Sequence, residues 1–227
     1  VSVVRPGIDP TAFAARIESP ERDRLRAMLG VAPDQILVGT VSCLKPQKSP
    51  EDFVRVAALV CQRVPAARCV LVGDGALRPK VEALLLAQGL QDRVTLLGWR
   101  RDVAALLKAF DVFVLTSQWE GLPCAILEAR ASRIPIVATR VGGAAEAIVE
   151  GIQGTLCPAG DVRAMAERVC QILEDERFRA DLRAGMQELP EEFTIQETLK
   201  QYQSIYAYLL HATRPSEDVM KLQPNRL

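Results

Sequence analysis

Two carboxylates eight residues apart enclose a glycine and a proline in the stretch Glu120-Gly-Leu-Pro-Cys-Ala-Ile-Leu-Glu128. The stretch follows an apolar run, Val112-Phe-Val-Leu-Thr116, that is typical of a buried strand. Pro123 suits the first turn of a helix, where its missing N–H would be unpaired anyway, so we expect a helix to begin near residue 122 or 123. The free amides of a first turn attract anions, and the helix dipole reinforces them. This pattern therefore predicts a bound phosphate.

The two carboxylates are expected on either side of that phosphate. Glu128 lies about five residues into the expected helix, roughly 7.5 Å along its axis, and Glu120 lies in the loop ahead of it. One carboxylate could accept hydroxyls on one side of a diphosphate, and the other those on the opposite side. Gly121 lets the backbone approach a bound group closely. The spacing alone is not specific, and the context of strand, turn and helix gives it weight.

Two lysines, Lys45 and Lys48, precede another expected helix that is announced by Ser49-Pro50-Glu51-Asp52. This tetrapeptide supplies Ser49 as an N-cap, a first-turn proline and acidic residues at the positive end of the helix dipole. The two ammonium groups could neutralise a diphosphate leaving group and its developing charge. The alternative is that they are ordinary surface lysines on a solvated loop.

Three further features allow both a binding and a structural interpretation. Gly142-Gly143 precedes an expected helix that carries Glu146, and is either a second anion-binding helix start or a permissive turn. Gly73-Asp74-Gly75 lacks the third glycine of a dinucleotide fingerprint, and a tight turn is the preferred interpretation. Trp99 and Arg100 could flank a nucleobase, or the tryptophan could serve packing alone.

Short apolar runs that predict buried strands alternate along the chain with amphipathic stretches that predict helices. The strands are expected at Ile36–Val41, Cys69–Val72, Val94–Leu97, Val112–Leu115 and Ile136–Ala138, and helices after Ser49 and at about 77–88, 102–109, 123–132, 143–149 and 161–174. This alternation predicts an α/β fold, a Rossmann-like doubly wound parallel sheet with helices on both faces. In such folds ligands bind beyond the carboxyl ends of the strands, where the loops named above all lie.

Composition narrows the classes of function. The chain has 227 residues with zero formal net charge, 49% hydrophobic and 25% charged residues, which is the composition of an ordinary globular domain. A chain without net charge has no overall electrostatic attraction for nucleic acid. No apolar run approaches the roughly 18 residues of a membrane span. Six cysteines without C-x-x-C spacing and a single histidine predict reduced cytosolic thiols and no metal cluster. The lack of a P-loop argues against an NTPase, and the lack of an Asp-x-Asp pair against a divalent-metal diphosphate site.

We expect four segments along the chain. They are an interdomain linker or leading strand at 1–12, the Rossmann-like domain at 13–190, a C-terminal helix at 191–212 and a flexible tail at 213–227. Helices are expected at 176–187 and 194–212, packed on the domain or on a missing neighbour. The chain begins Val-Ser-Val-Val-Arg without a methionine, which is typical of a part of a longer protein.

With these residues in view, roughly residues 1–190 resemble the family-4 retaining glycosyltransferases, which move a sugar from a nucleotide-sugar donor. Glu120-Gly-Leu-Pro-x-x-x-x-Glu128 is similar to that family's signature of two glutamates separated by seven residues. Gly73-Asp74-Gly75, Val141-Gly142-Gly143-x-x-Glu146 and the stretch from Gly154 to Asp161 support the resemblance.

The resemblance implies the GT-B fold, of which this segment would be the C-terminal, donor-binding half. By position, Glu128 would accept the ribose hydroxyls, Glu120 would contact the donor sugar and Lys48 would hold the diphosphate. The implied donor-binding residues also include Gly121, Leu122 and Pro123 against sugar or phosphate, and Lys45, Cys43, Arg100, Gly142 and Gly143.

One residue departs from the family pattern. The family usually places an arginine ahead of the lysine in a Gly-Arg-Leu context, where this chain has Ser42-Cys43-Leu44. Cys43 cannot neutralise phosphate as a guanidinium does. Either Lys45 takes over that role or the donor binds more weakly. Ser49 replaces a glycine often found after the lysine, and we expect this change to be harmless.

The function implied by the resemblance is metal-independent, cofactor-free transfer of a hexose with retention, by front-face attack of the acceptor hydroxyl. A UDP-sugar donor and cell-envelope polysaccharide synthesis are expected, although the residues themselves identify neither base, sugar nor acceptor. The expected partner is an N-terminal acceptor domain of the same polypeptide, without which this half would be inactive and through which alone it would contact a membrane. The expected location is the cytoplasm or the inner face of the membrane. Two alternatives stay open, namely a nucleotide-sugar epimerase or hydrolase on the same scaffold, and a non-catalytic nucleotide-binding module.

Overall fold

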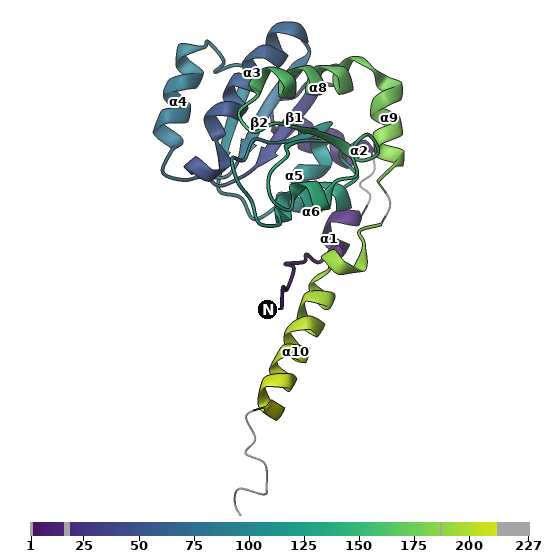
Figure 1. The fold of residues 1–227 in the computed structure, drawn as a ribbon. Helices are drawn as coiled ribbons and strands as arrows, with labels where there is room; N and C mark the ends of the chain where they lie inside the picture. The colour runs from purple at the N-terminus through teal and green to yellow at the C-terminus, as the bar shows by residue number, and fades with distance from the viewer. Residues whose placement is uncertain (1, 16–18, 187, 213–227) are drawn as a thin grey trace, which may run out of the picture.

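A computed structural model describes residues 2–15, 19–186 and 188–212 of the chain. Its centre is a parallel sheet of six strands in the order β3-β2-β1-β4-β5-β6 (Figure 1). The strands are β1 (Ile36–Val41), β2 (Ala67–Val72), β3 (Val94–Gly98), β4 (Val112–Leu115), β5 (Ile136–Thr139) and β6 (Gly154–Cys157). The strand order reverses between β1 and β4, and ligands of doubly wound folds bind beside the loops that follow the strands at such a reversal.

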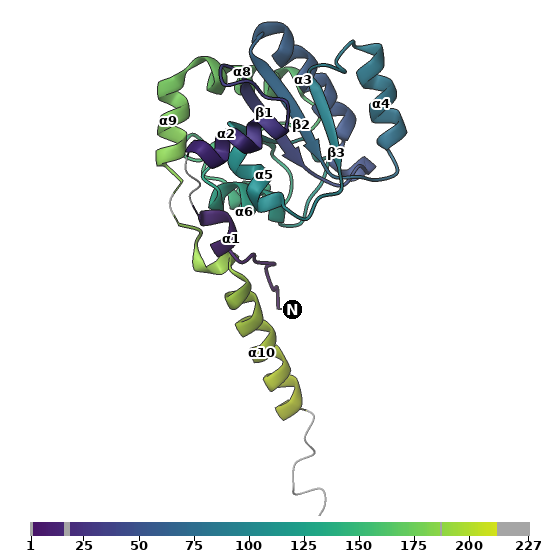
Figure 2. The same ribbon diagram turned by 180° about the vertical axis from the view of Figure 1, so that it is seen from behind.

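Helices cover both faces of the sheet, as the α/β prediction requires (Figures 1 and 2). One face packs against α3 (Pro50–Arg63), α4 (Arg78–Ala87) and α8 (Val162–Glu174), and the other against α2 (Ser19–Met28), α5 (Val103–Ala109), α6 (Cys124–Ala131) and α7 (Ala144–Ala147). Successive strand side chains alternate between the two faces. Val38 therefore lies in the first core and Leu37 in the second.

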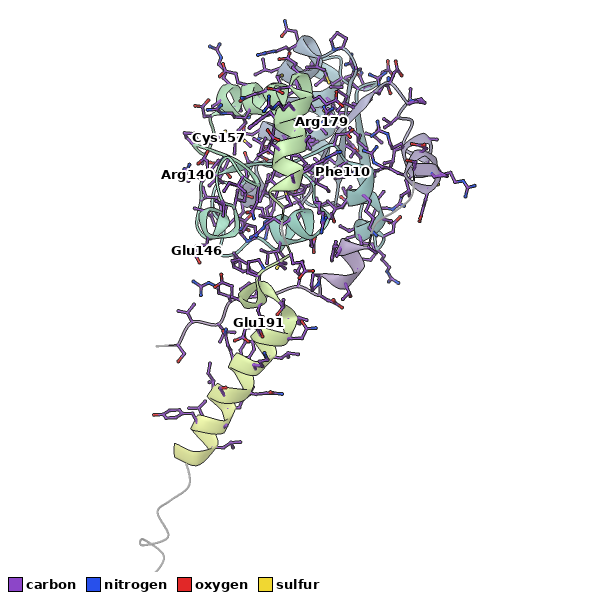
Figure 3. The ribbon with its side chains drawn as sticks, turned by 90° about the vertical axis from the view of Figure 1, so that its right-hand side faces the viewer. Phe110, Arg140, Glu146, Cys157, Arg179 and Glu191 are labelled. Carbon is purple, nitrogen blue, oxygen red and sulfur yellow. The ribbon has the colours of Figure 1, made fainter. Side chains whose placement is uncertain are left out.

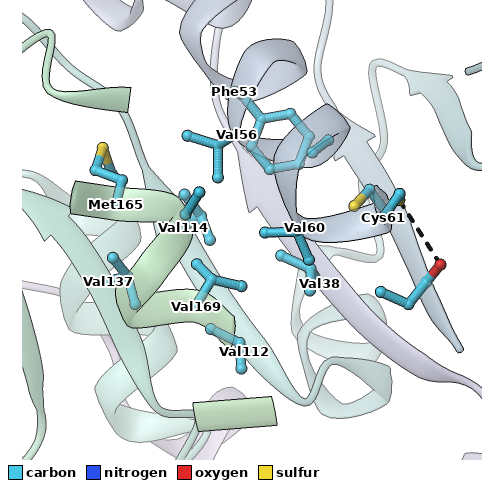
Figure 4. Close-up of a cluster of buried hydrophobic side chains, with 14 of the residues drawn as sticks. Val38, Phe53, Val56, Val60, Cys61, Val112, Val114, Val137, Met165 and Val169 are labelled. Atoms are coloured by element: carbon cyan, nitrogen blue, oxygen red, sulfur yellow. Dashed lines mark hydrogen bonds between the residues drawn. The ribbon is translucent and has the colours of Figure 1, made fainter. Parts of the chain in front are cut away.

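The strands contribute mainly valines to the first core, and β-branched side chains suit strands that are buried on both faces. In Figure 4 Val38 of the sheet lies beside Val60 of α3, and Val112 and Val137 lie beside Val169 of α8. Because these strands are apolar throughout, their sequence pattern is a continuous run rather than an alternation. This is why the runs could be recognised as strands.

The predicted strands are confirmed, with β1 and β4 beginning and ending at the predicted residues. The sequence interpretation did not include β6, α1 (Thr11–Ala14) or α2. The helix expected near residue 122 or 123 is α6, which begins one residue later because Pro123 occupies its N-cap position with extended backbone.

The amino ends of the central strands are fixed by a cluster of charges around Asp111. Its carboxylate accepts hydrogen bonds from Arg22 at 2.8 Å, from Arg26 at 2.9 Å and from the backbone amide of Leu37 at 2.8 Å. Burial alone would raise the pKa of Asp111, but the Leu37 amide and the two guanidinium groups hold it below its ordinary value. Asp111 thereby joins α2, β1 and the start of β4.

The segment after α9 (Glu176–Ala184) leads through a short 3-10 turn, Glu191–Phe193, into α10 (Ile195–Ala212), which projects from the rest of the molecule (Figures 1 and 3). Ile8 binds both sides of this junction, since its amide donates to Phe193 at 3.0 Å and its carbonyl accepts from Ile195 at 2.9 Å. The predicted tail at 213–227 lies outside the described residues. Across the described ranges, no helix combines the length and apolar character needed to cross a bilayer.

Candidate functional site

Lys48 and Glu120 meet at the point where the strand order reverses. Lys48 lies in the loop after β1 and Glu120 in the loop after β4, and the ammonium group of the lysine forms an ion pair with the carboxylate. Only 17% of the lysine side chain and 5% of the glutamate side chain are exposed. The Ser117 hydroxyl donates to the same carboxylate oxygen at 2.6 Å. Two residues that are 72 positions apart thus form one partly buried charged pair beyond the carboxyl ends of β1 and β4.

The Lys48 loop is held by bonds to the strand next to it. Thr116, at the end of β4, donates its hydroxyl to the carbonyl oxygens of Lys48 and Ser49, each at 3.0 Å. The amide of Gln118 donates to the carbonyl of Gln47 at 2.8 Å. These bonds fix the 3-10 turn Pro46–Lys48 and so place the ammonium group at the edge of the sheet where the carboxyl ends of the strands lie. We call this edge, with the loops that follow the strands, the rim.

Ser49 differs from the N-cap that its sequence context predicts. Its backbone is left-handed, with φ 43° and ψ 58°, and its hydroxyl donates to the Asp52 carboxylate at 2.7 Å instead of accepting a helix amide. This conformation favours glycine, because a Cβ crowds the following carbonyl there. The N-cap bond expected of Ser49 is therefore absent, and the residue holds a backbone conformation that glycine adopts with less strain.

The start of α6 offers free backbone donors beside the ion pair. The amides that find no acceptor among the described residues are those of Gly121, Leu122, Cys124 and Ala125. Pro123 contributes no N–H, and the amide of Ile126 is already bonded to the Pro123 carbonyl at 3.0 Å. Free donors at a helix N-terminus bind anions, and a lysine ammonium group lies next to these.

Glu128 stands on the same helix with an unpaired carboxylate. Its side chain is half-buried and makes no hydrogen bond or ion pair with any residue that the structure describes. Burial raises the pKa of Glu128 above its ordinary value, with no partner to offset the effect. A desolvated carboxylate without a donor can be satisfied by hydroxyl groups of a ligand.

The Cys124 thiol shows that these groups share one neighbourhood. Burial raises the pKa of Cys124, the charge of Glu128 raises it further, and Lys48 and Glu120 act on it as well. Lys48, Glu120 and Glu128 are therefore close to one half-buried thiol. The structure brings them together, although no ligand shows which group each of them binds.

The predicted second helix start packs directly against this site. The amide of Gly143 donates to the Gly121 carbonyl at 2.6 Å. A Cβ on Gly142, whose φ is 47°, would lie 1.9 Å from the Glu120 carbonyl oxygen. The two glycines thus allow the loop after β5 to approach the loop after β4, which explains their residue type. The helix that follows them, α7, is a single turn.

The loops after β2 and β3 continue the rim on its other side. Gly73 and Gly75 pack against the Ser42–Leu44 loop, since a Cβ on Gly73 would lie 1.9 Å from the Ser42 carbonyl oxygen, which supports the tight-turn interpretation. Arg100 is bonded to Asp102 at 2.6 and 2.8 Å, and Trp99 is exposed with Arg101 stacked on its ring. Neither contacts Lys48 or Glu120.

Lys45 and Cys43 are exposed on the loop after β1, without side-chain partners in the described chain. The sequence interpretation missed Thr116, Ser117 and Gln47, which fix the charged pair. Their signal was available, since Thr116 and Ser117 are polar residues that follow directly on an apolar strand. Surface hollows of about 300 to about 680 Å³ lie elsewhere on the described part of the chain, lined by other residues.

Comparisons with known proteins agree with this geometry. The family model described as "Glycosyl transferases group 1" matches residues 21–188. Over 179 residues the chain is 32% identical to an Escherichia coli protein named UDP-Gal:alpha-D-GlcNAc-diphosphoundecaprenol alpha-1,3-galactosyltransferase, covering 78% of this chain and 46% of the relative. Over 184 residues it is 32% identical to the N-acetyl-alpha-D-glucosaminyl L-malate synthase of Bacillus anthracis, covering 81% of this chain and 48% of the relative.

A solved structure shows the same fold. Anabaena Alr3699/HepE in complex with UDP-glucose superposes with a TM-score of 0.82 at 27% identity, covering 91% of this chain and 57% of that one. The chain therefore spans about half the length of the proteins it resembles.

Proposed function

Because the chain belongs to the glycosyl transferases group 1 family, we propose that it is the donor-binding half of an enzyme that transfers a hexose from a nucleotide-diphosphate sugar to a hydroxyl acceptor with retention. The observation that carries the proposal is the Lys48–Glu120 pair, which lies at the reversal of strand order beside the free amides of α6. UDP is the expected nucleotide, since the structural relative was solved with UDP-glucose and the E. coli relative is named for UDP-Gal.

Each charged residue has a role that its surroundings support. Lys48 and the amides of Gly121, Leu122 and Cys124 receive the diphosphate, whose charge grows as the bond to the sugar breaks. Glu120, held by Ser117 and Lys48, faces the donor sugar. Glu128 accepts the ribose hydroxyls, which supply the donors that its carboxylate lacks.

The chemistry proposed for this half requires neither a cofactor nor a metal ion. An ammonium group and backbone amides stabilise the departing phosphate, and a phosphate oxygen assists the acceptor hydroxyl as it attacks from the same face. No side-chain base from this half takes part. Lys45, exposed beside Lys48, supplies further positive charge where Cys43 replaces the arginine usual in the family.

The acceptor is proposed to bind to a second half of the same polypeptide, which closes the rim from the opposite side. The E. coli relative is named for an acceptor linked to diphosphoundecaprenol, which supports work at the inner face of the membrane in the synthesis of an envelope polysaccharide. Contact with that membrane is assigned to the other half.

Nucleotide binding is the direct test. Calorimetric titration of the chain with UDP, GDP and ADP should show saturable binding of UDP. Glu128→Gln should weaken it about 10- to 100-fold, the effect of losing charge-assisted hydrogen bonds. Glu174→Gln, which removes a surface partner of Arg63, is the matched control and should bind as the wild type does. A chain that binds none of the three nucleotides at millimolar concentration would refute the proposal.

Transfer itself is tested in the full-length enzyme. There Glu120→Gln should lower kcat by about 100-fold or more with little change in the KM for donor, and Glu128→Gln should mainly raise that KM. Donor consumed without acceptor would instead indicate an epimerase or hydrolase.

A further inference from the structure

The two charged residues assigned to the donor satisfy each other in the free chain. The ammonium group of Lys48 donates to Oε1 of Glu120, and both side chains are largely buried. In the proposed function the lysine receives the diphosphate, and the carboxylate contacts the sugar. A diphosphate bound to the lysine while Glu120 stays beside it would bring two negative charges together in a partly buried site, where like charges repel strongly. The pair as it stands is therefore not the donor-bound arrangement.

The two partners are held differently. Glu120 has two further donors, since the Ser117 hydroxyl reaches Oε1 at 2.6 Å and the side-chain amide of Gln47 reaches Oε2 at 3.4 Å. Ser117 is fully buried, and its carbonyl accepts a hydrogen bond from the Thr139 hydroxyl at 2.6 Å. Within the described ranges, Glu120 is the one side-chain partner of the Lys48 ammonium group, which ends a flexible four-carbon stem. When an anion competes, the lysine moves and the glutamate stays.

The departure of the lysine opens the carboxylate to a ligand. An ionised carboxylate has about four lone-pair positions on its two oxygens, and three donors already bind Glu120 in the free chain. Once the ammonium group leaves, Oε1 gains a free position, while Ser117 and Gln47 keep the orientation of the carboxylate. A hydroxyl group of a donor sugar can replace the lysine there. A nucleoside diphosphate without a sugar has no such group to offer.

We propose, resting on the proposed function, that donor binding exchanges the partner of Lys48 from Glu120 to the diphosphate, and that Ser117 and Gln47 are positioning residues that hold the released carboxylate for the sugar. The ion pair then favours the intact donor over the product nucleotide. Both ligands must break the pair, which lowers the apparent affinity for each. Only the nucleotide sugar supplies a new hydrogen bond to the carboxylate, so the product nucleotide leaves more readily and the lysine returns to Glu120.

The exchange is tested by calorimetric titration of the chain with UDP. Glu120→Gln releases the lysine from its ion pair and keeps an acceptor for the Ser117 hydroxyl, so it should bind UDP about 5- to 10-fold more tightly than the wild type does. In a chain that carries Lys48→Gln the same substitution should bring no gain, because the effect acts through the lysine. Glu174→Gln, which removes the carboxylate of a remote ion pair, should bind UDP as the wild type does.

The positioning role predicts a split between nucleotide and nucleotide sugar. The probes are UDP-glucose, UDP-galactose and UDP-N-acetylglucosamine, and the affinity of the tightest is divided by that of UDP. This ratio should fall about 10-fold in Glu120→Gln. For the intact donor the two effects offset each other, which accounts for the small change in KM that this variant should show.

Ser117→Ala separates positioning from folding. Its affinity for UDP should change less than about 2-fold, while the ratio falls several-fold, a split that a general loss of structure would not produce. Ser132→Ala is the matched control, since it removes a buried hydroxyl that has no partner among the described residues, and it should leave both quantities unchanged. Thermal melts confirm that each variant is folded.

The outcomes distinguish the exchange from the proposed function. Equal binding of UDP by the wild type and Glu120→Gln would show that the lysine does not change partner. An equal gain with and without Lys48 would show simple repulsion between carboxylate and diphosphate. Either result overturns the exchange and leaves the proposed function standing, and an unchanged ratio in Ser117→Ala overturns the positioning role. A wild-type chain that binds none of these nucleotides or nucleotide sugars refutes the proposed function and the exchange together.

Discussion

At the scale of single residues, the rim contains two residues that raise the free energy of the folded state. Glu128 is desolvated without a partner, and Ser49 adopts a left-handed backbone that most residues avoid. Conformations and charges of this kind persist where the surrounding structure enforces them, and they gather at functional sites. Here they flank the Lys48–Glu120 pair from both sides.

Glu128→Gln is expected to make the free chain more stable at neutral pH. Burial raises the pKa of Glu128, so the folded state binds a proton more tightly than the unfolded state does. Below the unfolded pKa both states are protonated, and the variant and the wild type should be equally stable. As the pH rises through the interval up to the folded pKa, the wild type should lose stability relative to the variant.

Urea unfolding at a series of values from about pH 4 to about pH 8 measures this difference. Glu174→Gln is the control, and its effect on stability should have the opposite sign. The hydrogen bond from Arg63 lowers the pKa of Glu174, so the wild type should gain stability relative to this variant as the pH rises. A Glu128→Gln chain that is less stable than the wild type at neutral pH would show that the carboxylate is already satisfied.

Arg133→Gly should stabilise the chain by about 1 kcal/mol. Arg133 has a φ of 57° just after α6, where the amides of Arg133 and Ile134 donate to the carbonyls of Arg130 and Ala129 and close the helix. Glycine is the preferred residue at this closing position because it carries no Cβ. The midpoint of urea denaturation should rise, and Arg133→Ala should give little or none of the gain.

At the scale of elements, the strands could be predicted because each is a run of buried apolar residues between turn signals. β6 was missed because its sequence, Gly-Thr-Leu-Cys, begins with a glycine and does not form a continuous run of β-branched and apolar residues as β4 and β5 do. The sequence placed Ser49 correctly before α3 but predicted the wrong hydrogen bond, because the turn is fixed by Thr116, which is far away in sequence and follows the neighbouring strand β4. The contact between Lys48 and Glu120 depends on strand order, which local sequence patterns do not contain.

Asp111→Ala should cost about 3 to 5 kcal/mol of unfolding free energy, because it leaves buried Arg26 without its carboxylate. Asp111 has a lowered pKa, so its contribution is complete above the unfolded pKa and is lost as the pH falls through the folded pKa. Asp102→Ala is the control, since its pair with Arg100 is exposed and should contribute less than about 1 kcal/mol. Equal losses in the two variants would contradict the assigned role of Asp111.

At the scale of the whole molecule, α10 is attached at its first turns and exposed beyond them. Its amide at Ile195 and the hydroxyl of Thr198 bind the segment that contains Arg5 and Ile8. Farther along, Tyr206, Tyr208 and Leu210 are more than half exposed. An apolar helix surface of this kind marks a place where another body can pack.

Deleting residues 204–227 should leave the thermal midpoint within about 2 °C of the wild type, because the exposed side chains of α10 contribute little to the core. Deleting residues 195–227 should lower it by about 2 to 4 °C or more, since it also removes the bonds to Ile8 and Arg5. Calorimetry measures both. Similar midpoints for the two deletions would show that the first turns of α10 do not anchor it.

The position of Ile8 between Phe193 and Ile195 has a consequence for engineering. The segment that leads into the α/β body, at Ile8, and the segment that leaves it, at Phe193 and Ile195, therefore lie side by side. A domain whose entering and leaving segments lie side by side can be excised there and fused to a different partner domain without straining either connection. The donor preference of the proposed site would then be transferred together with this domain to the fusion protein.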